Sequence, residues 1–415
     1  SNSLQAASSS LISFVILACS IPDNERSFIS RIALAWTSDK SNFFIKILAI
    51  SKVWAVVFLN KNLPPYNANF ILFDVSGEYS NAFKDINSWD PNYNFRVFST
   101  STDNNGFEPF KIPLWLLNEQ DLALLLMSDS HSQLPIVERM LKLVKIFAES
   151  DDRALAYKDY LIAKAIVSVL FSDSTPVRKK NDIFDIVQTC STPNFNLEAT
   201  INGLGYSRKF RECFNIDKMG TFTEGILFTE YVTSFIKEEL EDYEPSGNVT
   251  YTLQDMEKAL EFTLISEGWY KNENTYPDAV SVKVRLHSLI TGPYSSIFDV
   301  NTPMNCEQYL SSLLYNRNRQ KCQIININLD DMDDSIAAVI TKILTRIIFD
   351  FSKTVPNRGS IPFHILVDEA HRYIKNDNDH YLIGYNIFER VAKEGRKYGV
   401  ILNLISQRPV ELSET

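Results

Sequence analysis

The feature that most constrains the fold is an apolar run near the carboxyl end of the sequence that stops at two adjacent carboxylates. Residues 361–367 read Ile-Pro-Phe-His-Ile-Leu-Val, and Asp368 and Glu369 follow directly. A short run this apolar predicts a strand buried on both faces, as in a parallel sheet. Open α/β sheets bind ligands at the carboxyl ends of their strands, so both carboxylates are expected at a ligand-binding edge. The alternative is a solvated turn that only follows a strand.

A second apolar run, Val400–Ile405, predicts a neighbouring strand that leads directly into Gln407. A polar side chain at this strand tip, next to the carboxylate pair, is in a position to sense a terminal phosphate. Between the two strands, residues 388–399 predict a basic helix that stops at Gly399. The presence of Gln407 at the matching strand end favours a functional site over a solvated turn.

Residues 32–50 follow the order strand, short polar loop and apolar helix, and the loop contains Lys40 and Ser41. This order is typical of a phosphate-binding loop, in which the lysine contacts phosphate and the serine contacts magnesium. Such loops read G-x-x-x-x-G-K-[ST], because glycine lets the backbone approach the phosphates closely. Here Leu34 and Asp39 occupy the glycine positions, and the charge of the aspartate predicts weakened nucleotide binding.

Three interpretations of this loop stay open. The loop is degenerate, or the phosphate-binding loop lies elsewhere in the chain, or residues such as the missing glycines are absent from the sequence as written. The third interpretation would restore an ordinary phosphate-binding loop, so it decides more than any other ambiguity in the sequence.

The rest of the sequence predicts an α/β fold. A third apolar strand, Asn69–Asp74, ends in a carboxylate and a glycine turn, and a fourth is expected within residues 322–331, before a helix over residues 334–351. Between these strands the apolar residues recur at i, i+3 and i+4. Helices are expected at Leu122–Met127, Leu134–Phe147, Tyr157–Phe171 and Phe222–Ile236.

Three motifs in this order resemble the HerA branch of the HerA/FtsK hexameric DNA translocases: Asp-Glu-Ala-His-Arg at 368–372, Glu-Gly-Arg-Lys-Tyr-Gly at 394–399, and Ser-Gln-Arg-Pro at 406–409. Residues 74–79, Asp-x-x-Gly-Glu-Tyr, resemble the element that follows the P-loop helix in the same proteins. The resemblance implies a RecA-like P-loop ATPase sheet with a large helical insertion. Compared with the family, the P-loop is altered and both termini are expected to be incomplete.

The resemblance also implies roles for single residues. Glu369 would activate the attacking water, Gln407 would sense the γ-phosphate, and Arg396 would reach the neighbouring subunit's site as an arginine finger. A solvated helix face is the alternative for the arginine. Nucleotide binding would fall to Lys40, Ser41 and Asp74, and magnesium binding to Ser41 and Asp368.

The expected domain organisation follows from these placements. It comprises an amino-terminal segment (1–29), the first part of the ATPase core (30–111), the helical insertion (112–290), and the second part of the core with the Asp-Glu and Gln strands (291–415).

Composition restricts the partners. The net charge of −10 leaves no broad basic surface for wrapping DNA, so any contact with nucleic acid needs a local basic cluster. The five cysteines and five histidines show no metal-binding spacing. The cysteines are expected to be reduced thiols in a cytoplasmic protein. The apolar stretches are too short, or too interrupted by lysine, to predict a membrane segment.

The resemblance therefore implies a HerA-like ring-forming ATPase, a homo-oligomer expected to be a hexamer, that uses ATP and Mg²⁺ to move double-stranded DNA through its pore. By the same analogy a nuclease or a sirtuin-like effector is the expected protein partner, and anti-phage defence the expected setting. The alternative is a catalytically weakened HerA-like scaffold that assembles an effector enzyme without efficient ATP hydrolysis.

Overall fold

The chain divides into two compact units, Ser1–Ala68 and Asn69–Thr415. In a computed structural model of the chain, the described residues are 68–83, 93–101, 107–127, 131–241, 243, 249–271, 273–374 and 384–406. The description that follows is therefore one of the second unit. The predicted phosphate-binding loop with Lys40 and Ser41, and the predicted sensor Gln407, lie outside the described residues.

A six-stranded sheet forms the centre of this unit, in the order β3-β2-β6-β1-β7-β8. Every neighbouring pair of these strands is parallel. The strands are β1 (Asn69–Asp74), β2 (Phe95–Ser99), β3 (Glu108–Pro109), β6 (Ile324–Asn328), β7 (Phe363–Val367) and β8 (Val400–Leu404). The strands predicted from the four apolar runs are confirmed, and so is the α/β fold class.

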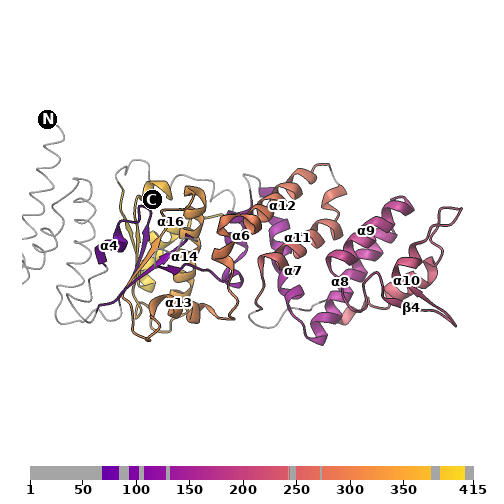
Figure 1. Cartoon of the computed structure of the whole chain (residues 1–415), viewed down its shortest axis with the longest axis horizontal. Coiled ribbons are helices and arrows are strands. Elements are labelled where there is room, and N and C mark those ends of the chain that lie inside the picture. The colour runs from indigo at the N-terminus through magenta and orange to yellow at the C-terminus, as the bar shows by residue number, and fades with distance from the viewer. Residues whose placement is uncertain are drawn as a thin grey trace, which may run out of the picture. The chain divides into compact units, whose positions relative to one another are not determined.

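The centre of the sheet is buried because its strands are apolar on both faces. All six residues of β1 are buried, as are four of the five residues of β7. Helix α14 (Asp334–Thr354) connects β6 to β7, and α16 (Ile387–Glu394) precedes β8. These helices lie beside the sheet with α13 (Cys306–Leu314) (Figure 1). Parallel neighbours need such crossover connections, which the helices supply.

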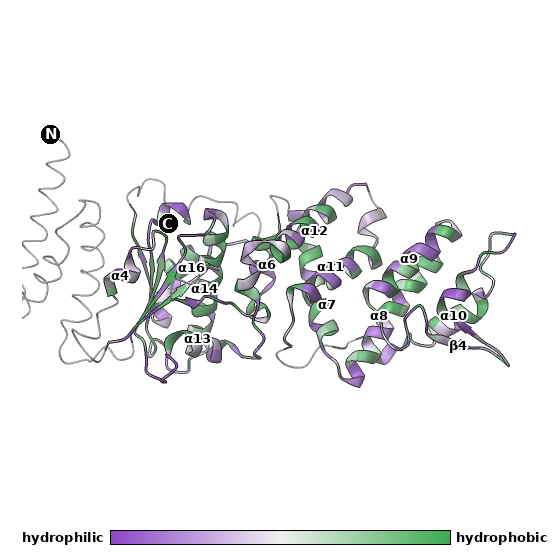
Figure 2. Cartoon of the chain, in the orientation of Figure 1, coloured by the Kyte–Doolittle hydropathy of each residue, from purple (hydrophilic) through white to green (hydrophobic). Residues whose placement is uncertain are grey.

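Helices dominate the chain between β3 and β6. Besides α13, the α-helices described there are α6 (Glu119–Leu126), α7 (Leu134–Ala148), α8 (Asp152–Leu170), α9 (Pro176–Thr189), α10 (Gly225–Thr233), α11 (Leu253–Ser266) and α12 (Tyr276–Thr291). The four helices expected in this region are confirmed, with ends shifted by a few residues. Hydrophobic and hydrophilic residues alternate along them, which is typical of helices that bury one side (Figure 2). The domain boundaries at 112 and 290 stay predictions.

One feature of this region has no counterpart in the sequence-based expectation. A two-stranded antiparallel hairpin, β4 (Thr200–Asn202) with β5 (Ser207–Lys209), lies between α9 and α10. Most of its residues are exposed, so the pattern of buried apolar residues that reveals the central strands is missing. Ile201 alone is buried and attaches the hairpin to the core.

The predicted glycine stop is confirmed at Gly399, which ends the 3-10 turn η9 (Gly395–Tyr398) with φ 78°. A Cβ at this position would lie 2.8 Å from the Cα of Gly359. The backbone carbonyl of Gly399 accepts a hydrogen bond of 2.9 Å from the amide of Phe363, at the start of β7. The close approach of the two glycines therefore fixes the start of the strand that delivers the carboxylates.

We expect Gly399→Ala to lower the melting temperature clearly, because it combines a left-handed backbone with a clash against backbone atoms. The left-handed conformation costs about 1–2 kcal/mol for a residue with a side chain, and the overlap adds about 1–3 kcal/mol. Gly220→Ala is the matched control: its φ is 79°, and nothing lies within 4 Å of the added Cβ. Equal melting temperatures for the two variants would contradict the role of the Gly359 contact.

Candidate active site

Asp74 and Asp368 lie at the carboxyl ends of neighbouring strands. The register of β1 and β7 pairs Phe73 with Val367, so the two aspartates occupy the next position on each strand. The amide of Asp368 donates a hydrogen bond of 3.2 Å to the carbonyl of Phe73. The backbone thus continues the sheet up to the carboxylates, and both side chains are fully buried. The register therefore brings these two strand ends to one edge of the sheet.

Asp74 is anchored by its surroundings. Its Oδ2 accepts a hydrogen bond of 3.0 Å from the amide of Tyr79 and another of 3.0 Å from Nδ2 of Asn326 on β6. Burial raises the pKa of this carboxyl above its usual range, and the hydrogen bonds from Asn326 and from backbone amides oppose that rise. Burying the Asp74 carboxylate without a full set of hydrogen-bond partners therefore lowers the stability of the folded state.

Several further oxygen atoms gather around the two aspartates. The hydroxyls of Tyr79 and Tyr373, Oδ1 of Asp74 and Oδ1 of Asn326 are buried, and none has a hydrogen-bond partner within the described part of the chain. Burial, followed by the charges of Asp368 and Asp74, raises the pKa of Tyr79. Burial also raises the pKa of Tyr373, and the same two carboxylates add to that rise. The charges of the two aspartates thus act on both phenols.

This set of oxygens suits a magnesium ion. Hard cations take oxygen ligands, and Mg²⁺ is usually held by one or two carboxylates together with water and substrate phosphates. Unpaired buried acceptors, such as Oδ1 of Asp74, are the groups that a cation or its water ligands would satisfy. Among the residues with described positions, no group of three His, Cys, Asp or Glu side chains could hold a metal ion by itself. Phosphate oxygens or another side chain would have to complete the coordination.

Glu369 has an unusual backbone conformation. Its φ is 45° and its ψ is 46°, in the left-handed region, and only one other non-glycine residue of the described chain, Arg319, has a positive φ. This conformation ends β7 and begins the 3-10 turn η8 (Ala370–Arg372). Such strain persists where the surrounding structure enforces it, and it is common at functional sites.

The described residues among the predicted site residues fall into two groups. Asp74, Asp368 and Glu369 come together at one edge of the sheet. Arg396 does not join them: it lies in η9 just before β8, so in a parallel sheet it is near the opposite edge, and its side chain is exposed. Arg396 therefore does not act on the carboxylates of its own subunit, and a role at the site of a neighbouring subunit stays a prediction.

Sequence reasoning missed Asn326, Tyr79 and Tyr373 as members of the site. A signal for Asn326 was present, since β6 reads Ile-Ile-Asn-Ile-Asn and an amide inside an otherwise apolar strand requires a polar partner. The tyrosines carried no such signal, because an aromatic residue after a strand is ordinarily part of the core.

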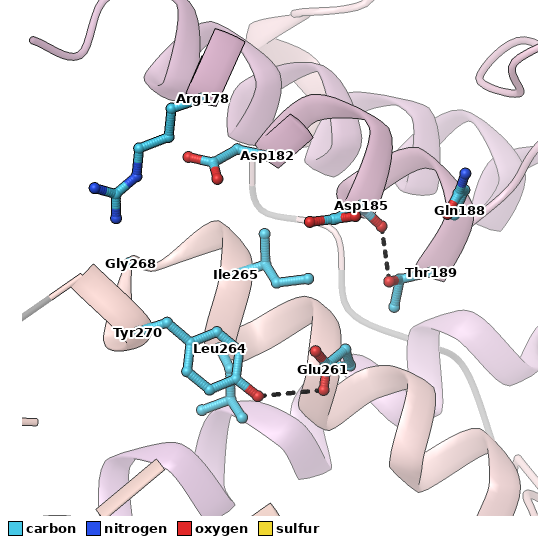
Figure 3. A pocket seen from close by; sticks show the side chains of 10 residues that line it. All are labelled: Arg178, Asp182, Asp185, Gln188, Thr189, Glu261, Leu264, Ile265, Gly268 and Tyr270. Carbon is cyan, nitrogen blue, oxygen red and sulfur yellow. Dashed lines mark hydrogen bonds between the residues drawn. The ribbon is translucent and has the colours of Figure 1, made fainter. Parts of the chain in front are cut away.

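A cavity of about 460 Å³ lies elsewhere, within the helical region (Figure 3). Its walls come from α9, α11 and the turn after α11, and include Asp182, Asp185, Glu261 and Tyr270. The hydroxyl of Tyr270 donates a hydrogen bond of 3.3 Å to Glu261. No residue of the carboxylate edge lines this cavity, so the candidate site does not extend into it.

We expect Asp74→Asn to raise the melting temperature at neutral pH, by an amount that corresponds to about 1 kcal/mol. The raised pKa of Asp74 means that the folded state holds this proton more tightly than the unfolded state, so its contribution to stability falls as the pH rises through the folded pKa. Asparagine keeps an oxygen for the two donors and removes the charge. The difference between variant and wild type should shrink as the pH is lowered.

The control for this prediction is Asp217→Asn. Hydrogen bonds from the backbone and side chain of Thr221 lower the pKa of Asp217, so its stabilising contribution is present above the unfolded pKa and is lost as the pH falls. The substitution should therefore lower the melting temperature at neutral pH, the opposite of Asp74→Asn. A lower melting temperature for Asp74→Asn would show that its hydrogen bonds outweigh the burial cost.

Parallel strands, crossover helices and a carboxylate pair at the carboxyl edge define an α/β domain built on a parallel sheet. Residues 52–184, about a third of the chain, match the family model described as "Helicase HerA, central domain". The match includes Asp74 and excludes Lys40, Asp368 and Glu369. This part of the chain is therefore similar to the central domain of HerA.

Individual proteins agree with this assignment. The chain is 32% identical over 125 residues to the DNA double-strand break repair helicase HerA of Saccharolobus solfataricus. This alignment covers 29% of this chain and 23% of the relative. It is 37% identical over 90 residues to a probable helicase of Methanocaldococcus jannaschii, covering 20% of this chain and 17% of the relative. The chain therefore matches less than a quarter of the length of these relatives.

Among solved structures, the bacterial conjugative coupling protein TrwB aligns with 83% of this chain and 63% of its own, at 9% identity and a TM-score of 0.33. Within the described residues, no helix is long and apolar enough to cross a membrane.

Proposed function

We propose that the chain is an ATP hydrolase of the HerA type that couples hydrolysis to the movement of double-stranded DNA in a homo-oligomeric ring. The observation that supports this most is the edge formed by Asp74, Asp368 and Glu369, where two buried aspartates stand beside a glutamate held in a left-handed turn. The HerA match supplies the class of reaction.

In this proposal each residue of the edge has a separate role. Asp368 and Asp74 hold the metal and its water ligands, and Glu369 accepts the proton of the attacking water. A bound Mg²⁺ supplies charge neutralisation at the phosphates. Lys40 and Ser41 contact the phosphates and the metal, Gln407 senses the γ-phosphate, and Arg396 acts on the site of the next subunit.

The burial of the edge matters for this chemistry. Charges separated by protein rather than by water interact more strongly, so a carboxylate there orients water and metal more firmly than an exposed one. Glu369 has a side chain that is only 12% exposed. Its left-handed backbone fixes the direction in which the carboxylate leaves the end of β7.

The experiment is a measurement of phosphate release by the full chain with ATP and Mg²⁺, with and without duplex DNA, together with the equilibrium affinity for a fluorescent ATP analogue. We expect turnover that duplex DNA stimulates and that Lys40→Ala abolishes. Turnover unchanged by Lys40→Ala would contradict the role of that lysine. Absence of both turnover and nucleotide binding would contradict the ATPase proposal.

The second candidate is a HerA-like scaffold that assembles an effector enzyme without efficient hydrolysis. The replacement of both loop glycines by Leu34 and Asp39 favours it. Nucleotide binding without turnover, in an assembled ring, would support the scaffold over the motor. A nuclease or sirtuin-like effector remains a prediction in either case.

A further inference from the structure

We infer that His371 is a positioning residue for Glu369, and that Ser406 at the end of β8 orients the His371 ring. The inference rests on the proposed function in one respect, since it takes Glu369 as the group that accepts the proton from water. It goes further by assigning a role to two side chains at the ends of neighbouring strands.

The local geometry brings the three side chains together. The left-handed backbone of Glu369 turns the chain sharply, so that His371, two residues later in the 3-10 turn η8, points back toward the glutamate. Nδ1 of His371 lies 3.4 Å from Oε2 of Glu369 and 3.1 Å from Oγ of Ser406. The side chains of Glu369 and His371 are 12% and 14% exposed, so solvent screens their interaction little.

Backbone hydrogen bonds hold the turn and the end of β8 in one unit. The amide of Ala370 donates a hydrogen bond of 2.8 Å to the carbonyl of Ile405, and the amide of Ile405 donates one of 3.0 Å to the carbonyl of Val367. Because these bonds fix the residues that directly precede Ser406 and His371, a shift of the end of β8 moves the ring. Ser406 directly precedes Gln407, the proposed phosphate sensor, in the sequence.

The contacts determine the tautomer of His371. An ionised carboxylate offers only lone pairs, so Nδ1 must carry hydrogen for its approach to Glu369 to be attractive. A serine hydroxyl can either accept or donate, and therefore tolerates both forms of the ring. Of the two side chains next to Nδ1 of His371, only Glu369 therefore requires the Nδ1–H tautomer of the ring. Nδ1 is within hydrogen-bond distance of Oγ of Ser406, and its approach to Oε2 of Glu369 at 3.4 Å is an electrostatic contact. A hydrogen on Nδ1 makes both contacts favourable, so the ring limits the rotation of Glu369 and holds it toward the edge of the sheet.

The kinetic test compares three variants of the full chain. Asparagine places a donor near the position of Nδ1, so His371→Asn should keep kcat within about threefold of wild type. His371→Leu removes the donor and should lower kcat by about 10–100-fold, as is typical for loss of a residue that orients an active group, with little change in KM for ATP. The control is His287→Leu, which breaks a similar contact, Nδ1 to Oε1 of Glu257 at 3.3 Å, in the helical region.

These outcomes decide the inference. Wild-type kcat in His371→Leu, or an equal loss in His287→Leu, would overturn it. A loss in His371→Leu that His371→Asn rescues would support it, because a purely structural role would not depend on a donor at Nδ1.

A second measurement does not need turnover, so it separates this inference from the ATPase proposal. The chain has five histidines, and selective ¹⁵N labelling with His371→Asn as reference would assign the His371 ring signals by NMR. We expect the Nδ1–H tautomer in wild type and a shift toward Nε2–H in Glu369→Ala, where Ser406 can donate to a bare Nδ1. The same tautomer in both proteins would overturn the inference, even if ATP hydrolysis were confirmed.

Discussion

Glu369→Gln is expected to lower the rate of ATP hydrolysis by about 10²–10⁴-fold while leaving ATP binding near the wild-type level. Glutamine has nearly the shape of glutamate, so the left-handed turn at the end of β7 and the contact with His371 can persist. It cannot accept a proton from water, because its amide has no basic oxygen. The loss should therefore fall on kcat, and phosphate release together with equilibrium nucleotide binding would measure it.

The control for this variant is Glu78→Gln, at the same edge of the sheet. Glu78 follows the Gly77 turn and is exposed, so its carboxylate is in water rather than beside the buried aspartates. We expect its turnover to stay within about twofold of wild type, because the substitution changes only an exposed side chain and keeps the backbone amide that bonds Asp74. Turnover in Glu369→Gln equal to that in Glu78→Gln would refute Glu369 as the proton acceptor.

The elements that the sequence predicted well are those whose signal is local. The runs that became β1 and β7 are apolar over consecutive residues and lead into a polar side chain, and a strand buried in a parallel sheet needs no other information to be recognised. β8 lies at the edge of the described sheet with only Val400 buried, so its apolar run predicted the strand but not its exposure. The rule that ligands bind at the carboxyl ends of parallel strands predicted the edge for Asp368 and Glu369, whereas the role of Asp74 came only from the family resemblance.

The elements that the sequence did not predict depend on contacts between distant residues. Asn326 reaches Asp74 across 252 positions of the chain, and its partner is set by the strand order rather than by any neighbouring residue. The left-handed conformation of Glu369 has no sequence signal either, because glycine is the residue that usually indicates it. Tertiary structure imposes that strain locally.

A buried ion pair shows the same dependence on distant contacts. Arg346 of α14 meets Asp121 of α6 with Nη2 2.5 Å from Oδ2 and Nε 3.1 Å from Oδ1, and Nη2 also donates to the carbonyl of Leu116 at 2.8 Å. The side chains are 10% and 4% exposed. The pair joins the helix that packs beside the sheet to the first helix after β3.

We expect Asp121→Asn to destabilise the folded chain by about 3 kcal/mol, near the lower end of the 3–5 kcal/mol that breaking a buried pair costs. Asparagine keeps the shape and can still cap the start of α6, so the loss reports the charge. The guanidinium stays buried, and arginine cannot release its proton. A remaining contact with Asp350, at 3.3 Å, places the estimate at the lower end. Urea unfolding followed by circular dichroism would measure the change.

The opposite substitution, Arg346→Met, should cost less, and its cost should fall as the pH is lowered. Burial raises the pKa of Asp121, against the effect of Arg346, so without the arginine the carboxyl can take up a proton and lose its charge. Glu267→Gln, which removes the half-exposed partner of Arg139, is the control and should cost about 0.5 kcal/mol or less. If Asp121→Asn cost no more than Glu267→Gln, water would have to reach the pair in solution, and the contact between α14 and α6 would be looser than the distances indicate.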